Sequence, residues 1–126
     1  MPGKCGFTES QWNSGVAEAR EILRQRAALR RTITYSELAN ELHSVTIGYH
    51  EPAMDYLLGD VSTDEFEGGR PLLSVIVVHK YRDQEPGNGF YELAEALDFD
   101  ISDRQAFWVA ELNRVFDYWC NSQAIA

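Results

Sequence analysis

Apolar residues recur every three or four positions in several stretches of the chain, which is the spacing of an amphipathic helix. The longest stripe of this kind lies within residues 9–30 and consists of Trp12, Val16, Ala19, Leu23 and Ala27. Thr8 and Gln11 precede it with the spacing of a capping box, in which side chains bond the free amides of a first turn. We therefore predict a long first helix over residues 9–30.

Two short helices are predicted next. Thr34 and Glu37 repeat the capping-box spacing before a helix that ends near residue 42. Pro52 suits the first position of another helix, because the amide that proline lacks would have no partner there, and Gly59 can end that helix. Residues 60–70 are acidic and close with two glycines, so we predict an acidic loop.

One stretch has a different character. Residues 72–78 are apolar except for Ser74, are rich in β-branched side chains and are too few for most helices. Such a run is typical of a strand that is covered on both faces. The best partners for it are the short stretches near Ile33 and Ile47. The pattern predicts a small sheet around residues 72–80.

The last third of the chain returns to the helical pattern. Residues 85–89 combine proline, asparagine and glycine as tight turns do, and residues 90–97 predict a short helix. Ser102 and Gln105 form a third capping box before a long last helix. That helix carries more aromatic side chains than one small core needs: Trp108, Phe116, Tyr118 and Trp119. We therefore expect a homodimer through the C-terminal helix.

The totals agree with a single domain that spans residues 1–126. The chain is 44% hydrophobic and 25% charged, which is ordinary for a globular protein. A chain of this length can bury a core without the help of metals or disulfides. We expect an α+β domain that is mostly helical, with about five helices and the small sheet.

The net charge is −9 and is unevenly distributed. Residues 1–31 hold six cations and three anions, whereas the rest of the chain holds five cations and seventeen anions. Loops often carry binding residues, and acidic loops steer a basic partner. We therefore predict a non-catalytic accessory or inhibitory protein that binds a basic protein partner, as immunity proteins do. Its candidate binding residues are Asp60, Asp64, Glu65, Glu67, Asp83 and Glu85.

Nucleic-acid binding is the first alternative. Its candidate residues are Arg20, Arg24, Arg31, Lys80 and Arg82. Phosphate contacts supply most non-specific affinity, so DNA-binding domains usually carry an excess of cations. A chain at −9 would have to gather its arginines on one face of the first helix, but their spacing spreads them over more than one.

Three motifs share their order and type with one known family: Ile-Thr-Tyr-Ser-Glu-Leu-Ala at 33–39, an apolar run ending in His-Lys at 75–80, and Gly-Asn-Gly-Phe-Tyr at 87–91. Across residues 32–91 the chain thus resembles the winged-helix half of alkylguanine-DNA alkyltransferases and alkyltransferase-like proteins. The resemblance implies a winged-helix-like fold. It does not imply alkyl transfer, because Val78 stands where the family has its reactive cysteine. Residues 70–94 also resemble segments of small bacterial proteins.

An enzyme is the second alternative, with His79 and its neighbours as a nuclease-like site at the end of the predicted strand. A divalent-metal nuclease needs a carboxylate two residues before Lys80, and Val78 occupies that position. The histidines lack the spacing of a metal site, and no glycine pattern for nucleotides is present, so we predict no metal and no other cofactor. Packing of His79 in the core, with both ring nitrogens covered, would exclude the enzyme.

The two cysteines, Cys5 and Cys120, lie at opposite ends of the chain. Their low number predicts two reduced thiols, and a disulfide between the ends is the alternative. No apolar stretch follows Lys4 as in a signal peptide, and no apolar run is long enough to span a bilayer. We expect a cytoplasmic protein that does not bind membranes.

Overall fold

The structure is a computed structural model that describes residues 6–49, 51–79 and 86–125. Within these residues it contains five α-helices, one 3₁₀ helix (η1) and two short strands. They are α1 (Glu9–Ala28), β1 (Ile33–Thr34), α2 (Tyr35–Glu41), α3 (Pro52–Glu67), η1 (Leu73–Ile76), β2 (Val77–Val78), α4 (Asn88–Ala96) and α5 (Arg104–Ile125). The prediction of a mostly helical α+β fold with a small sheet is confirmed.

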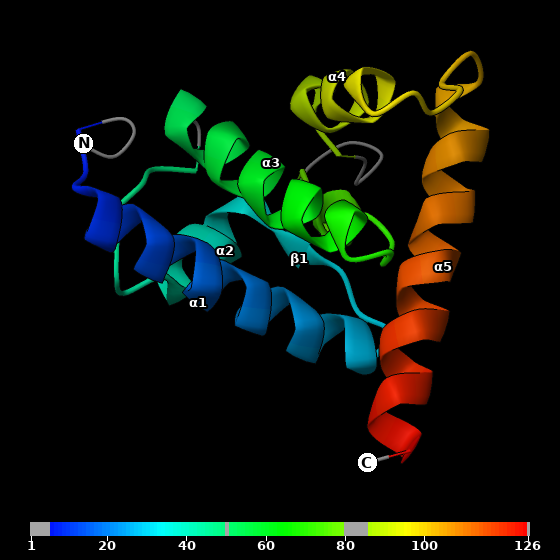
Figure 1. Cartoon of the computed structure of the whole chain (residues 1–126), viewed down its shortest axis with the longest axis horizontal. Helices are drawn as coiled ribbons and strands as arrows, with labels where there is room; N and C mark the ends of the chain where they lie inside the picture. The colour runs from blue at the N-terminus through cyan, green and yellow to red at the C-terminus, as the bar shows by residue number, and fades with distance from the viewer. Residues whose placement is uncertain (1–5, 50, 80–85, 126) are drawn as a thin grey trace.

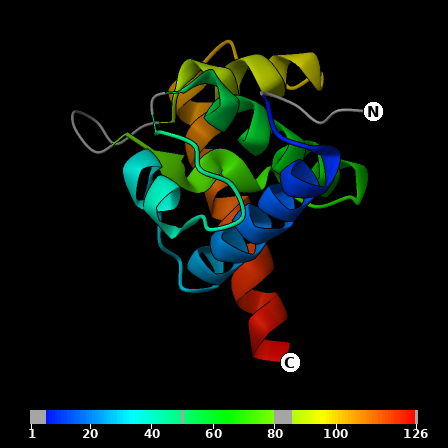
Figure 2. The ribbon, with the colours of Figure 1, turned by 90° about the vertical axis from the view of Figure 1, so that its left-hand side faces the viewer.

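The three long helices frame the molecule. Helices α1 and α3 run side by side in the same direction, and α5 crosses near their C-terminal ends (Figure 1). The predicted stripe of α1 is buried between them, with Leu23 and Ala27 fully covered. Figure 2 shows η1 and β2 passing through the middle, enclosed by helices. The hydrophobic core is therefore centred on residues 72–78.

The strand predicted over this central stretch is largely wrong. Only Val77 and Val78 are extended, and they pair in parallel with Ile33 and Thr34, so the partner near Ile33 is confirmed. Ile47 is buried, but the sheet has only two strands in the described part of the chain. Residues 73–76 coil into η1 because the surrounding helices offer no free backbone edge with which a longer strand could pair.

Side chains instead satisfy the buried backbone of this stretch. The amide of Leu72 donates to the Glu111 carboxylate at 2.8 Å, and the amide of Ser74 donates to the Ser62 hydroxyl at 2.9 Å. The Ser62 hydroxyl donates in turn to that of Ser74 at 2.6 Å. Each of these amides would otherwise cost free energy as an unpaired buried donor.

The acidic loop predicted for residues 60–70 is also wrong. Helix α3 continues through Gly59 to Glu67, because Val61, Ser62 and Glu65 extend its buried face. The helix ends in a Schellman motif in which Gly69 has a φ of +78° and the amide of Arg70 donates to the Glu65 carbonyl. The helix therefore ends at Gly68 and Gly69 and not at Gly59, and Gly69 provides the positive φ.

The predicted capping boxes are confirmed in two cases and wrong in one, and Pro52 begins α3 as predicted. Thr8 and Thr34 each form the complete capping box. Helix α5 begins instead behind Asp103, whose carboxylate accepts the amide of Ala106 at 3.0 Å. Ser102 bonds Asp100 rather than the helix. A carboxylate at the N-terminus also gains from the helix dipole, which favours Asp103 over the hydroxyl.

None of the helices in the described ranges combines the length and apolar character needed to cross a bilayer.

Candidate functional site

Two of the arginines predicted as nucleic-acid-binding residues, Arg20 and Arg24, converge with Arg70 on one buried carboxylate. Arg24 donates to Glu65 Oε1 at 2.7 Å, and Arg20 Nε lies 3.4 Å from the same oxygen. Arg70 donates to Oε2 at 2.7 Å. Glu65 is fully buried, and a buried carboxylate needs such partners to offset its lost hydration. These cations therefore serve the packing of α1 on α3.

The placement of Glu65 on a protein-binding surface is accordingly wrong, because no part of the side chain reaches solvent. Asp64 is exposed but pairs with Arg20 at 2.6 Å. Asp60 is half-buried and accepts the indole N–H of Trp12 at 2.7 Å. Three of the predicted binding carboxylates thus take part in contacts between α3 and α1.

The other predicted site residues are dispersed. Glu67 and Arg31 are exposed, at the end of α3 and just after α1. Four lie outside the described residues: Lys80, Arg82, Asp83 and Glu85. Neither predicted set lies wholly within the described residues, and the described members come from α1, α3 and the segment just after α1.

The remaining arginines of α1 and its C-terminal cap also have acidic partners. Arg26 pairs with Glu41 of α2 at 2.5 Å, and Arg30 pairs with Asp117 of α5 at 2.8 Å. Arg24 additionally lies over the Trp119 ring, 4.5 Å from its centroid. The basic character of the N-terminal segment is therefore largely neutralised within the fold.

A groove of about 530 Å³ separates α3 from α4 on the opposite side of α3 from this network. Six residues of α3 and four of α4 line it. Its acidic members are Asp55, Asp60 and Glu92, and the Tyr56 ring is 59% exposed beside them. These residues make the groove an acidic concavity.

Asp55 has the most perturbed environment in this groove. Much of the side chain is exposed, but its carboxyl end lies against the first turn of α4, close to Gly89. Burial raises the pKa of the Asp55 carboxyl, the charge of Glu92 raises it further, and His79 partly opposes the rise. The carboxylates of Asp55 and Glu92 therefore repel each other across the groove.

Sequence reasoning missed Asp55 and Glu92 because each is a single acid on an amphipathic helix. The available signal was the recurrence of acid and glycine one turn apart on both helices, Asp55 before Gly59 and Gly89 before Glu92. Spacing of this kind places the two residues on one helix face.

A second polar cluster lies next to the groove, where β1 and α2 meet the segment after β2. The Tyr35 hydroxyl accepts the amide of Gly87 at 3.0 Å, and the His79 ring lies 5.0 Å from that of Tyr35. Burial raises the pKa of Tyr35, the Gly87 amide opposes this, and the charge of Asp55 adds to the rise. A Cβ at Gly87 would lie 3.1 Å from the Tyr35 hydroxyl, a contact tight enough that the hydroxyl would have to shift.

His79 itself is exposed, so the condition that would exclude the enzyme is not met. Its neighbours Lys80, Tyr81 and Arg82 lie outside the described residues. The cluster consequently consists of one imidazole, one buried phenol and one carboxylate, with no further polar group described beside His79.

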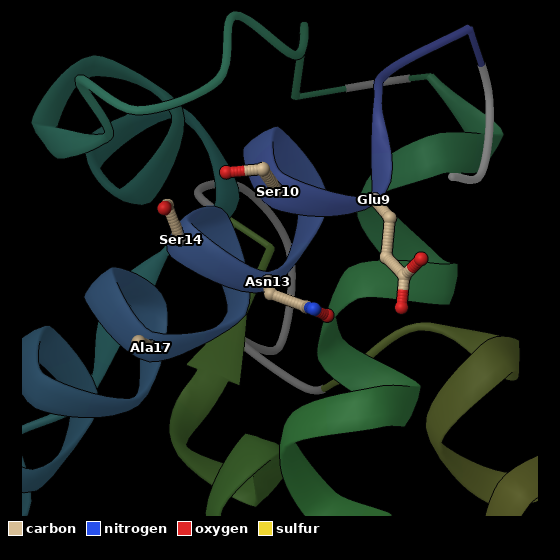
Figure 3. Close-up of a pocket in the computed structure, with 5 residues that line it drawn as sticks. All are labelled: Glu9, Ser10, Asn13, Ser14 and Ala17. Atoms are coloured by element: carbon tan, nitrogen blue, oxygen red, sulfur yellow. The ribbon is translucent and has the colours of Figure 1, made fainter. Parts of the chain in front are cut away.

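Two further observations give no candidate site. The hollow in Figure 3 is lined by Glu9, Ser10, Asn13, Ser14 and Ala17. All five belong to α1, so the hollow has no opposing wall. Over the residues that the structure describes, no group of three or more His, Cys, Asp or Glu side chains could hold a metal ion.

Comparisons with models of known protein families, with curated proteins and with solved structures gave no match to this chain.

Proposed function

We propose that this protein is a non-catalytic accessory or inhibitory protein that binds a basic protein partner through its acidic surface. The observation that carries the proposal is the pairing of the α1 arginines with carboxylates of α2, α3 and α5. A surface that offers carboxylates rather than free arginines attracts cationic proteins and repels phosphates.

The balance of charge in the described residues supports this reading. Of their eight arginines, six form ion pairs with carboxylates of the same chain. Arg104 instead donates to Asn88 and lies over the Tyr91 ring, and Arg31 is exposed. The same residues hold eighteen carboxylates, so internal pairing leaves the surface strongly negative.

Affinity purification of the tagged chain from its own cells tests the proposal. At about 50 mM salt we expect one basic protein to co-purify in a stoichiometric amount and to dissociate as salt is raised, because screening weakens the attraction. The purified partner should lose its activity when the chain is added. A partner that is acidic, or that stays bound regardless of salt, would contradict the electrostatic proposal.

The second candidate is a winged-helix nucleic-acid binder, and it rests on the resemblance of residues 32–91 together with exposed Arg31. Fluorescence anisotropy with a DNA duplex of about 20 bp, which covers two helical turns, tests this candidate. We expect no binding at about 50 mM salt. Salt-sensitive binding that is lost in Arg31→Ala would favour the winged-helix binder over the acidic-surface protein.

The third candidate is a nuclease-like enzyme, supported by the exposed imidazole of His79 beside Tyr35. Incubation with single-stranded RNA and DNA of mixed sequence tests it. Cleavage that disappears in His79→Ala and in Tyr35→Phe would establish the enzyme, and we expect none.

A further inference from the structure

The groove between α3 and α4 holds two carboxylates, Asp55 and Glu92, that differ from the carboxylates paired with arginine elsewhere in the described fold. Carboxylates that face α1 or α5 are neutralised by arginine, as Glu65, Glu41 and Asp117 show. Asp55 and Glu92 have no hydrogen bond or ion pair within the described residues. The fold thus leaves two mutually repelling carboxylates in a concave site, with His79 only partly offsetting the charge at Asp55.

The groove is also open at the level of these carboxylates. Gly89 carries no side chain where a Cβ would lie 3.0 Å from Asp55 Cγ, and no atom lies within 4 Å of the Cβ position of Gly59. Exposed Tyr56 adds an aromatic ring to the same wall. The space beside the two acids is therefore bounded by an aromatic ring and widened by two glycines.

The charge and the aromatic wall of the groove favour a guanidinium over an ammonium group as its occupant. A guanidinium is planar, can donate hydrogen bonds to two carboxylates at once along its edges and stacks on aromatic rings, whereas an ammonium is a compact and strongly hydrated charge. A cation placed between Asp55 and Glu92 would relieve their repulsion and gain from both charges.

We propose that the groove between α3 and α4 binds an arginine side chain of a basic protein segment, with the guanidinium between Asp55 and Glu92 and beside Tyr56. This inference rests on the proposed function, and it names the part of the acidic surface at which the partner docks and the side chain that anchors it.

The test is a ¹⁵N NMR titration of the full chain at low salt with three capped peptides: Gly-Arg-Gly-Arg-Gly, its lysine counterpart and its neutral citrulline counterpart. We expect the arginine peptide to shift the amides of Asp55, Tyr56, Gly89 and Glu92 first. The lysine peptide should bind more weakly, and the citrulline peptide should not bind.

Two charge-matched double variants provide the control. Asp55→Asn with Glu92→Gln should weaken binding of the arginine peptide about tenfold. Asp98→Asn with Glu95→Gln removes the same charge from exposed positions outside the groove and should weaken it less than about twofold. Thermal unfolding of the wild type and both double variants verifies that the folds are intact.

The outcomes separate the two proposals. Equal weakening in both double variants, or shifts centred on another acidic face, would overturn the groove while a salt-sensitive basic partner still supported the acidic surface. A lysine peptide that binds as tightly as the arginine peptide would overturn the arginine assignment. Failure of both cationic peptides to bind, together with the absence of a basic partner on purification, would overturn both.

Discussion

Gly59 lies within α3 and Gly69 lies just after it. The two glycines differ in backbone conformation, which is helical at Gly59 and left-handed at Gly69. Gly69 ends the helix with a φ of +78°, a conformation in which a side chain is strained, although the space around its Cβ position is empty. Gly59 lies inside the helix, and its Cβ position is also empty. A methyl group added at either position therefore changes stability through the backbone alone.

We predict that Gly69→Ala lowers the free energy of unfolding by about 1 kcal/mol, because alanine is strained at positive φ. Gly59→Ala should raise it by about 0.5–1 kcal/mol, because alanine favours the helix and restricts the unfolded chain. Urea unfolding monitored by circular dichroism measures both. Changes of the same sign in the two variants would contradict this account.

Asp55 gives a prediction that depends on pH. Its pKa is raised in the folded protein, so the native state binds this proton more tightly than the unfolded state does, and stability falls as pH rises through the interval between the two pKa values. Asp55→Asn removes this penalty. At pH 7 we expect the variant to be more stable by about 0.5 kcal/mol, because solvent screening limits the effect of a partly exposed group.

The advantage of Asp55→Asn should vanish below the pKa of an unfolded aspartate, where the wild-type carboxyl is protonated in both states. Unfolding curves for the two proteins at pH 7 and at about pH 3 provide the comparison. An advantage that is the same at both pH values would show that the charge of Asp55 is not its source.

At the scale of elements, Glu65 links three segments. It lies on α3, and its partners Arg20 and Arg24 come from α1 while Arg70 follows the end of α3. Removal of one member of a buried ionic network leaves the other members without compensation.

We predict that Glu65→Gln lowers the free energy of unfolding by about 2–4 kcal/mol, because glutamine keeps the shape but cannot neutralise three arginines. Glu67→Gln is the matched control, since Glu67 is exposed on the same helix, and it should change stability by less than about 0.5 kcal/mol. Thermal and urea unfolding give both values. A loss in Glu65→Gln no larger than that in Glu67→Gln would contradict a structural role for the network.

Elements defined by local interactions could be predicted from the sequence, and those defined by distant partners could not. The capping boxes at Thr8 and Thr34 involve residues three apart, and both are present. The 3₁₀ geometry of residues 73–76 depends on acceptors from Ser62 and Glu111, which no local pattern reveals. Burial of this stretch was predictable from its composition, but its geometry was not.

The same distinction applies to the candidate site. The composition shows the excess of acids. It does not show which of these acids remain without arginine partners. Glu65 belongs to an acidic stretch of sequence and is nevertheless buried, whereas Glu92 is one acid in an ordinary helix and lines the groove. Only the packing of α3 between α1 and α4 separates these two environments.

At the scale of the whole molecule, the aromatic side chains of α5 bear on the predicted homodimer. Trp108, Phe116 and Trp119 pack against the core, and the indole of Trp108 donates to the Val75 carbonyl at 3.2 Å. Tyr118 and Val109 are 41% and 43% exposed. The described part of α5 therefore presents little apolar surface to a second chain.

We consequently expect multi-angle light scattering to give the mass of one chain across a wide concentration range, because stable dimers bury about 800 Å² on each partner. A mass that rises toward two chains with concentration, and returns to one chain in Val109→Asp, would instead establish the predicted dimer through α5.

The bond from the Leu72 amide to Glu111 also has a consequence for biosynthesis. The donor leaves the ribosome 39 residues before its acceptor, so a growing chain that ends before α5 holds the most apolar stretch of the protein with its backbone unsatisfied. Native structure therefore cannot be completed stepwise from the N-terminus. The central segment can reach its native packing only after the last helix has been synthesised.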